Sequence, residues 1–471
     1  MKQQERRLDA STKSTVRSIE AILETLVLSV LYIVILRLLY TDGIFHWSNE
    51  NEKYILAGIY AVLSWVLINN LDGFQIGDLR RLDMAVAQWI GLFIVNFITY
   101  FQLCLIAKTM INVWPMIILM AIEVVVVVGF VYLYTAIYYR LYPPYRMIMI
   151  CGSEEAVGMK LKMDHRYDKY MIQRMISIHL GVDRICEEIH RYDAVVINDV
   201  PAQMRNDILK YCYQNDIRTY VVPKITDVIM RGAHNVSIFD TPLLVVRNSG
   251  LNVGQRFAKR TMDIVLSLIA LIVAAPIMLV TAIAIKLEDH GPVFFTQKRA
   301  TIGGKEFDIL KFRSMIVDAE KGGFSIPATG QDPRITKVGR IIRACRVDEL
   351  PQIINILKGD MSIVGPRPER LEHVQKYSES IPEFAFRLKV KGGLTGYAQI
   401  YGKYNTSAYD KLRLDLMYIE NYSFLLDIKL ILMTIRVMLS KESTEGFEKA
   451  DEFERLKKEM LSEVEGSQYE K

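Results

Sequence analysis

Four long apolar runs within the first 140 residues constrain the fold of this chain more than any other feature. They cover residues 19–40, 54–68, 84–107 and 113–138. A helix needs about 20 apolar residues to cross a bilayer, and only the second run is clearly shorter. Backbone polar groups inside hydrocarbon must be satisfied within the segment, so we expect helices. Residues 1–142 are therefore predicted to form four transmembrane helices, which excludes a purely soluble protein.

The basic residues of the short loops predict the orientation of these helices. Loops rich in Lys and Arg stay in the cytoplasm. Basic residues are frequent before the first run, after the second and after the fourth, and sparse in the other loops: Lys2, Arg6, Arg7, Lys13, Arg17, Arg80, Arg81, Arg140 and Arg146 against Lys53 and Lys108. This alternation places the amino terminus and everything after the fourth run in the cytoplasm.

Glu123 is an acidic residue inside the fourth run. An acid at this depth can mark a transport pathway. No His, Lys or Arg stands beside it, and a run of five valines follows directly. We therefore favour anchoring or dimer contact over transport as the role of this block.

Residues 143–253 alternate between strand and helix patterns, which is typical of a small parallel α/β layer. Strands are expected at residues 147–151, 194–197, 219–222 and 243–246. Gly152 and Gly158 after the first strand suggest a dinucleotide-binding turn, but Glu154 and Glu155 place negative charge where phosphates would lie. The segment is predicted to be a degenerate Rossmann-like domain, with packing or regulation favoured over nucleotide binding.

A second apolar block covers residues 264–285 and is long enough to span a membrane. Pro276 lies in its interior, where proline removes a backbone hydrogen bond and kinks a helix. Basic residues flank the block on both sides: Arg256, Lys259, Arg260, Lys286, Lys298 and Arg299. An ordinary kinked crossing would carry one basic flank outside, whereas a helix that enters one leaflet and returns keeps both inside. We predict the re-entrant arrangement.

Four motif clusters follow, at residues 295–315, 340–352, 359–368 and 390–399. All contain basic residues, and the net charge of the chain is +5, which suits a phosphate-bearing substrate. The Gly-Pro-Arg-Pro turn at residues 365–368 is stiff because both prolines fix φ, so Arg367 is well placed for bidentate phosphate binding. Lys311, Arg313 and Lys391 would extend this anion site. The alternative is an ordinary surface turn with solvated charges.

Asp348 and Glu349 form an acidic pair among these basic residues. Asp348 stands just before a helical pattern with Pro351 in its first turn, so one interpretation is a simple helix N-cap. The other interpretation uses the same geometry: a carboxylate near Arg343 and Arg346 stays ionised and can act as a nucleophile. Glu349 could then hold a hard cation that neutralises a diphosphate.

Together these clusters resemble the bacterial sugar transferase family, the monotopic polyprenyl-phosphate phosphoglycosyl transferases, over about residues 255–441. The preceding segments are similar to the large form of this family, the undecaprenyl-phosphate hexose-phosphate transferases. The resemblance implies a membrane protein with an α-helical bundle at 1–142 and a Rossmann-like α/β domain at 143–253. A mostly α-helical monotopic catalytic domain at 254–441 with a re-entrant helix at 264–285, and a charged tail at 442–471, would follow.

The resemblance also implies a two-step reaction at the cytoplasmic face of the bacterial inner membrane. An aspartate attacks the β-phosphate of a UDP-sugar, releases UMP and passes the sugar phosphate to undecaprenyl phosphate, with Mg²⁺ as cofactor. Asp348 matches the nucleophile and Glu349 its partner, and both are the expected metal ligands. The phosphate-binding motif positions of the family are matched by Lys311, Arg343, Gly365, Pro366, Arg367 and Pro368.

Several expectations about partners and alternatives accompany this resemblance. The product would serve capsule or exopolysaccharide synthesis, with galactose or glucose as the sugar and a UDP-N-acetyl sugar as the alternative. A homodimer is expected, and no nucleic-acid partner. A non-catalytic scaffold or regulator of polysaccharide assembly is a second class, against which the acidic pair and Arg367 argue. A nucleotide-sugar dehydratase is disfavoured because the α/β domain lacks a full glycine fingerprint and a Tyr-x-x-x-Lys pair.

Overall fold

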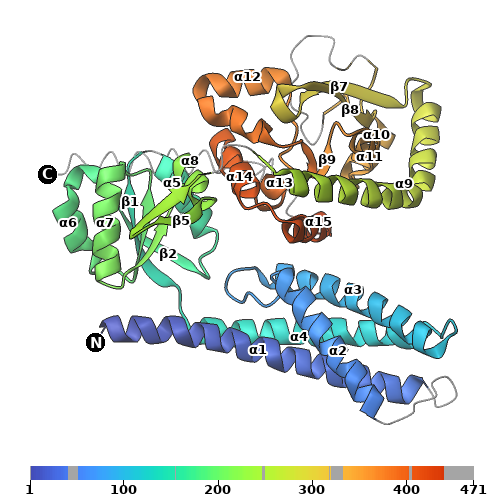
Figure 1. Cartoon of the computed structure of the whole chain (residues 1–471), viewed down its shortest axis with the longest axis horizontal. Coiled ribbons are helices and arrows are strands. Elements are labelled where there is room, and N and C mark those ends of the chain that lie inside the picture. Colours follow the sequence, from blue (N-terminus) through green and yellow to red (C-terminus); the bar gives the residue numbers. More distant parts are fainter. Residues whose placement is uncertain are drawn as a thin grey trace. The chain divides into compact units, whose positions relative to one another are not determined.

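The computed structural model of this chain describes residues 2–40, 51–153, 155–246, 250–317, 319, 332–402 and 406–439. These residues form two compact units that meet in sequence between Val222 and Pro223. The first unit holds a helical bundle and an α/β layer, and the second holds a long bent helix and a mixed α/β lobe (Figure 1). The charged tail expected at residues 442–471 lies outside the described residues.

The first unit begins with a bundle of helices α1 (Lys2–Leu39), α2 (Asn51–Asn70), α3 (Arg81–Ala107) and α4 (Trp114–Leu141). The helices share one apolar core that includes Leu28, Ile68, Leu92 and Leu119. Many of their other apolar side chains face outward, as expected of helices solvated by lipid. Among the described residues α1, α3, α4 and the later helix α9 are long and apolar enough to cross a membrane, whereas α2, the short second run, is not one of them.

The intramembrane acid Glu123 has neutral partners in the core of this bundle. Its Oε1 accepts a short hydrogen bond from the Tyr60 hydroxyl, and its Oε2 accepts one from the Asn96 side chain at 2.6 Å. Tyr60 lies on α2, Asn96 on α3 and Glu123 on α4. The three residues therefore join three helices, which fits the anchoring interpretation of this block.

The α/β layer is a four-stranded parallel sheet in the order β2-β1-β3-β4. Its strands are β1 (Tyr145–Cys151), β2 (Tyr170–Ser177), β3 (Ala194–Asn198) and β4 (Arg218–Val221). Helices α5 (Glu155–Asp164), α6 (Val182–Ile189) and α7 (Ala202–Gln214) connect them, with a 3-10 turn, η1 (Ile178–Leu180), before α6. The all-buried strand β3 is typical of a parallel sheet covered on both faces.

The turn after β1 is closed by the backbone of the neighbouring strand. A Cβ on Gly152 would lie 1.8 Å from the Asp199 carbonyl oxygen, and the Gly152 N–H donates to the Asn198 carbonyl at 3.1 Å. Glycine is therefore required here by a close backbone approach within the sheet. This contact gives Gly152 a packing role and supports the packing interpretation of the turn over the nucleotide one.

One strand prediction for residues 143–253 was wrong, and two strands, β2 and β5 (His234–Ile238), were missed. The segment predicted as a fourth parallel strand lies in β6 (Thr241–Val245), which pairs only with β5 in an antiparallel hairpin within the second unit. The strand that completes the sheet is β2, at the sheet edge beside β1. Only Ile172 and Ile176 of β2 are buried, so its sequence carries little of the apolar signal that predicts buried strands.

The second unit packs short strands among helices. Its elements besides the hairpin and α9 are α8 (Ile225–Arg231), β7 (Phe294–Ala300), η2 (Ile302–Gly304), β8 (Glu306–Phe312), α10 (Lys337–Ala344), η3 (Val347–Glu349), α11 (Gln352–Lys358), β9 (Ser362–Val364), α12 (Leu371–Ser380), η4 (Pro382–Lys389), β10 (Gly393–Thr395), α13 (Tyr397–Tyr401), α14 (Ala408–Glu420) and α15 (Phe424–Leu439). Strands β7 and β8 form an antiparallel pair, and β9 and β10 form a parallel pair. Phe384, Leu412, Leu416 and Leu430 form the centre of its largest apolar core.

Helix α9 (Val253–Asp289) is 37 residues long and bends sharply between its two halves (Figure 1). Pro276 lies inside it and accounts for the bend, because proline cannot continue the helical hydrogen-bond ladder. Its middle is apolar and exposed, with Ile272 and Val273 about three quarters and two thirds uncovered.

Both ends of α9 are tied to the same lobe. At the amino-terminal end Lys259 donates to Asp427 at 2.6 Å, and Arg260 donates to the Ile356 and Leu357 carbonyls that end α11. At the other end Glu288 accepts from the first backbone N–H of α10 at 2.7 Å. The apolar stretch therefore leaves one folded unit and returns to it.

The close approach at Gly152 generates a stability prediction. Gly152→Ala is expected to lower the thermal unfolding midpoint of the purified protein by several degrees, because overpacking against a backbone atom costs about 1–3 kcal/mol. Gly129→Ala on α4 is the control, since a Cβ there meets no atom within 4 Å. Equal midpoints for the two variants in a fluorescence-detected melt would contradict the packing role.

Candidate active site

The acidic pair lies where three segments distant in sequence meet. Strand β8 carries Lys311, the single turn η3 carries Asp348 and Glu349, and the loop after β9 carries Arg367. Each of the three segments contributes charge to one cluster, so the fold brings together four of the residues singled out in the sequence.

The local backbone around the pair differs from the N-cap interpretation. Asp348 lies within the 3-10 turn η3, and the residue that caps α11 is Pro351. Arg346 before the turn has φ of 58°, a left-handed conformation that is uncommon for a residue with a side chain. This reversal connects α10 to η3, so Asp348 is presented by a tight turn between two helices rather than used to cap one.

Glu349 is held between two cations. Its Oε1 accepts hydrogen bonds from Lys311 Nζ at 2.9 Å and from Arg367 Nη2 at 2.7 Å, and its side chain is only 12% exposed. Burial alone would raise the pKa of Glu349, but the charges of Arg367 and Lys311 outweigh burial and hold that pKa well below the usual range. Glu349 is therefore ionised throughout the neutral range.

Asp348 has a different environment from its neighbour. Its Oδ1 is buried and accepts no hydrogen bond from the residues that the structure describes. Burial, reinforced by the negative charge of Glu349, raises the pKa of Asp348, although Lys311, Arg343 and Arg346 oppose the rise. The sequence predicts that Asp348 stays ionised near Arg343 and Arg346, and the structure adds that desolvation has a larger effect on its pKa than these two charges. The pair thus combines a carboxylate whose Oε1 accepts from two cations with one whose buried Oδ1 accepts no hydrogen bond from the described residues.

The two cations Lys311 and Arg343, which lie near the acidic pair, differ in the interactions that they make. Burial and the positive charge of Arg367 lower the pKa of Lys311, while Glu349 opposes this effect. Arg343, on α10, interacts with Asp348 by charge and makes no hydrogen bond through its side chain within the described part of the chain. Arg343 is therefore available to an incoming anion.

Two of the expected phosphate-binding residues do not join this cluster. Arg313 donates through both terminal nitrogens to Asp289, at 2.6 Å for Nη1, and through Nε to the Pro292 carbonyl. Its side chain is only 8% exposed. Its contacts explain the difference: Arg313 fixes the carboxyl-terminal end of α9, and phosphate binding would require breaking that pair.

Lys391 also lies outside the cluster around the acidic pair. Its Nζ and Arg260 Nη2 both lie 3.6 Å from the position that a Cβ on Gly359 would take. Burial and the charge of Arg260 lower the pKa of Lys391. Lys391 therefore belongs to a second group of cations, at the root of α9.

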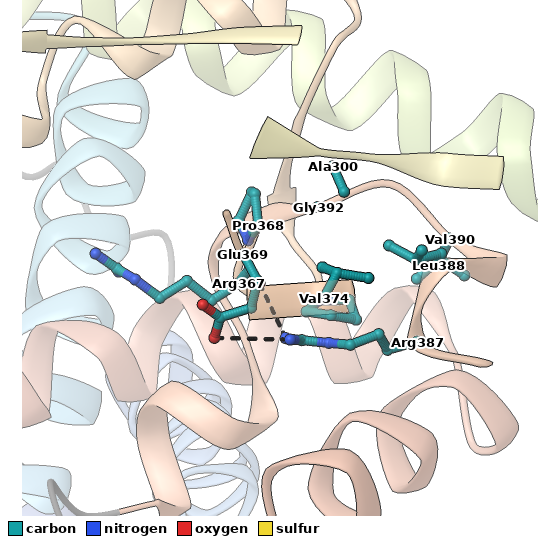
Figure 2. A pocket seen from close by; sticks show the side chains of 10 residues that line it. Ala300, Arg367, Pro368, Glu369, Val374, Arg387, Leu388, Val390 and Gly392 are labelled. Atoms are coloured by element: carbon teal, nitrogen blue, oxygen red, sulfur yellow. Dashed lines mark hydrogen bonds and ion pairs between the residues drawn. The ribbon is translucent and has the colours of Figure 1, made fainter. Parts of the chain in front are cut away.

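The Gly-Pro-Arg-Pro loop is built against two other elements. The Gly365 N–H donates to the Thr395 carbonyl at 2.8 Å, which joins it to β10. Behind the loop, Arg387 of η4 faces the Arg367 backbone and Glu369, while the Arg367 side chain extends away from it (Figure 2). The cavity between the loop and η4 is about 10 Å³, which is room for about one water molecule and not for a substrate.

Sequence reasoning missed the buried charges behind the loop: Glu369, Arg387 and Asp415. Arg387 and Asp415 have side chains 3% and 1% exposed and form an ion pair at 2.8 Å. Neither residue stands in a motif cluster, and the charged positions of a helix such as α14 are normally solvated. Only the fold reveals that these positions face inward.

Comparison with protein families identifies the same part of the chain. Residues 254–441 match the family model described as bacterial sugar transferase. This segment contains α9, the acidic pair and the Gly-Pro-Arg-Pro loop.

Several curated proteins are similar to the chain. A UDP-N-acetylgalactosamine-undecaprenyl-phosphate N-acetylgalactosaminephosphotransferase of Aeromonas hydrophila is 38% identical over 261 residues, which are 53% of this chain and 60% of that protein. A UDP-glucose:undecaprenyl-phosphate glucose-1-phosphate transferase of Escherichia coli (strain K12) is 43% identical over 211 residues, 44% of each chain. A protein of the same name from Caulobacter vibrioides is 41% identical over 210 residues, 43% of this chain and 78% of its own length. The match thus spans about half the length of the first two relatives and most of the third.

Proposed function

Because the chain belongs to the bacterial sugar transferase family, we propose that it transfers a sugar 1-phosphate from a UDP-sugar to undecaprenyl phosphate. The observation that carries this proposal is the division of labour in the acidic pair. Glu349 accepts from Lys311 and Arg367 through Oε1, whereas Asp348 keeps a buried oxygen without a hydrogen-bond partner among the described residues. Such a carboxylate is a candidate nucleophile beside a site for diphosphate.

The reaction proceeds in two displacements at one phosphorus atom. A carboxylate oxygen of Asp348 attacks the β-phosphorus of the UDP-sugar, the bond from that phosphorus to the bridging oxygen breaks, and UMP leaves with that oxygen. The sugar phosphate is then held as an acyl phosphate. A phosphate oxygen of undecaprenyl phosphate attacks the same phosphorus, and the Asp348 carboxylate is released as the leaving group. Covalent capture divides one transfer between two phosphate substrates into two simpler steps.

The surrounding cations suit this chemistry. Arg367 is partly exposed and can donate other N–H groups of its guanidinium to a phosphate while its Nη2 donates to Glu349. Arg343 offers a second guanidinium near Asp348. Positive charge at these points offsets the charge that develops on the leaving UMP.

Mg²⁺ is the cofactor that we propose for this site. Asp348 Oδ1 is an unengaged buried oxygen, and Mg²⁺ in phosphoryl-transfer sites uses one or two carboxylates together with substrate phosphates. No group of three or more His, Cys, Asp or Glu residues suited to a metal occurs in the described part of the chain, so substrate oxygens would complete the shell. Asp348 and Glu349 would hold the ion, which would neutralise diphosphate charge when bound.

The relatives indicate the chemical class of the donor sugar and not its identity. The names of the relatives specify glucose and N-acetylgalactosamine. We propose a UDP-hexose or UDP-N-acetylhexosamine, with glucose and galactose as the first donors to test. Placement of the catalytic unit on the cytoplasmic face of a bacterial inner membrane, and a homodimer, stay predictions.

We propose that α9 enters one leaflet and returns. Three features support this: the bend at Pro276, the exposed apolar middle, and the attachment of both ends to one unit. A straight helix of this length would be about 55 Å long, far more than the hydrocarbon core requires.

The first prediction concerns the nucleophile. Asp348→Asn is expected to lower UMP release by about 10³-fold or more, because the amide cannot form the acyl phosphate. UMP release would be measured with undecaprenyl phosphate and a panel of UDP-sugars, and EDTA should stop it until Mg²⁺ is restored. Arg413→Lys, a change on α14, is the control. Undiminished release by the asparagine variant would rule out the covalent role. A wild type that is inactive with every donor would instead favour the scaffold alternative.

The second prediction concerns pH. Burial and Glu349 raise the pKa of Asp348, so the nucleophile is protonated at a higher pH than an ordinary aspartate. As the pH falls through that raised pKa, kcat/KM is expected to fall about tenfold per pH unit. Arg346→Gln removes a charge that opposes the rise, so its acidic limb should move to higher pH. A limb that stays in place or moves to lower pH would contradict the assignment to Asp348.

The third prediction concerns α9. Single cysteines placed at Gln255 and Lys286 in a variant without native cysteines should both react with a membrane-impermeant thiol reagent from the same side of sealed vesicles. Labelling from opposite sides would show a crossing and overturn the re-entrant proposal.

A further inference from the structure

The loop that carries Arg367 depends on donors from outside itself. Pro366 and Pro368 have no backbone N–H, so this stretch offers mainly carbonyl acceptors. Each carbonyl from residue 366 to 369 is held by a different group, and these groups are Gly393 N at 2.9 Å, Arg387 Nη2 at 2.9 Å, Arg299 Nη1 at 3.2 Å and Ala300 N at 3.1 Å. The geometry of the loop is therefore set by its neighbours.

Arg387 is the donor to the Arg367 carbonyl, and it is almost completely buried. Its Nη2 lies 2.8 Å from Asp415 Oδ2 on α14, and its Nη1 lies 3.6 Å from Glu369 Oε1. Its guanidinium also lies over the Phe384 ring at 4.9 Å. A rigid, planar guanidinium can lie within ion-pair distance of both carboxylates while its Nη2 donates to the carbonyl, which a lysine ammonium cannot do with the same geometry.

Stability alone does not explain this arrangement. A buried ion pair contributes little net stability, because the desolvation of both charges offsets their attraction. The contact that distinguishes Arg387 is its hydrogen bond to the backbone of Arg367, whose side chain extends away from Arg387 (Figure 2). That side chain donates to Glu349 at 2.7 Å. Arg367 therefore connects the buried charged group around Arg387 to the acidic pair, because its backbone contacts Arg387 and its side chain contacts Glu349.

We propose that Arg387, held by Asp415 and Glu369, is a positioning residue that fixes the backbone of Arg367 so that its guanidinium meets Glu349 and the substrate phosphates. Arg387 acts through Arg367 and does not touch the reacting atoms. The substrate part of this proposal rests on the proposed function, whereas the backbone part does not.

A double-mutant cycle tests the coupling. Arg387→Lys is expected to lower kcat/KM for UMP release by roughly 10- to 100-fold, the range for residues that orient a functional side chain. In an Arg367→Lys background the same change should cost less than about threefold, because the group that it positions is already lost. Arg413→Lys is the matched control, since this arginine on α14 pairs with Asp410 at 2.8 Å and lies over the Tyr409 ring at 4.1 Å. Costs that simply add would overturn the proposal.

A second measurement is independent of activity. In Asp415→Asn the partner of Arg387 loses its charge at nearly constant shape, so hydrogen exchange of the peptide covering residues 362–370 should accelerate at least threefold, with residues 306–312 unchanged. Unchanged exchange in the loop, in a variant that melts as the wild type does, would overturn the proposal. An inactive wild type that shows the exchange effect would instead refute only the proposed function. General acceleration across the unit would mean that Asp415 acts on the fold as a whole, which also overturns it.

Discussion

A single carboxylate oxygen, Oε1 of Glu349, holds the catalytic unit in its working arrangement. It accepts from Lys311 at 2.9 Å and from Arg367 at 2.7 Å, and so joins a strand, a turn and a loop that are up to 56 residues apart (311 to 367). Without it two cations would repel each other at the centre of the site. Because Glu349 takes both cations, the environment moves the pKa values of the two adjacent carboxyl groups in opposite directions. That separation is what assigns different roles to two similar residues.

The same unit solves a second problem, which is how to hold charged chemistry beside hydrocarbon. Buried polar contacts concentrate at the two ends of α9, where Lys259, Arg260 and Glu288 bind other elements. The middle of the helix carries apolar side chains and one proline. Polar anchoring and apolar exposure are thus divided along a single helix, which is the division that the proposed re-entrant arrangement requires.

Much of this arrangement could be predicted from the sequence, because the signals are local. Apolar runs identify α1, α3, α4 and α9, Pro276 identifies the bend, and the acidic pair stands out among basic residues. Strand β2 was missed because an edge strand with two buried isoleucines has little apolar periodicity. The strand predicted at residues 243–246, which lies mostly in β6, was assigned to the wrong sheet because a short strand pattern does not specify its partner.

Side-chain partners were the least predictable feature, for a physical reason. The sequence predicts that Arg313 and Lys391 extend the phosphate-binding site. In the structure Arg313 binds Asp289, 24 residues earlier, and Lys391 lies beside Arg260. Arg387 and Asp415 read as surface charges and are buried. The role of a charged side chain depends on the residue that the fold places opposite it. Contacts between distant segments cannot be predicted from the spacing of residues along the sequence.

The attachment of α9 at both ends has a consequence for the movement of the proposed lipid product between the two leaflets. A helix attached at both ends to one folded unit has no free end that could cross a bilayer, and it provides no path across the bilayer for another molecule. If the proposed reaction takes place beside a re-entrant α9, its lipid product stays in the leaflet in which it is made. Transfer of that product to the opposite leaflet would then require a path outside this helix, so synthesis and export would be physically separate steps.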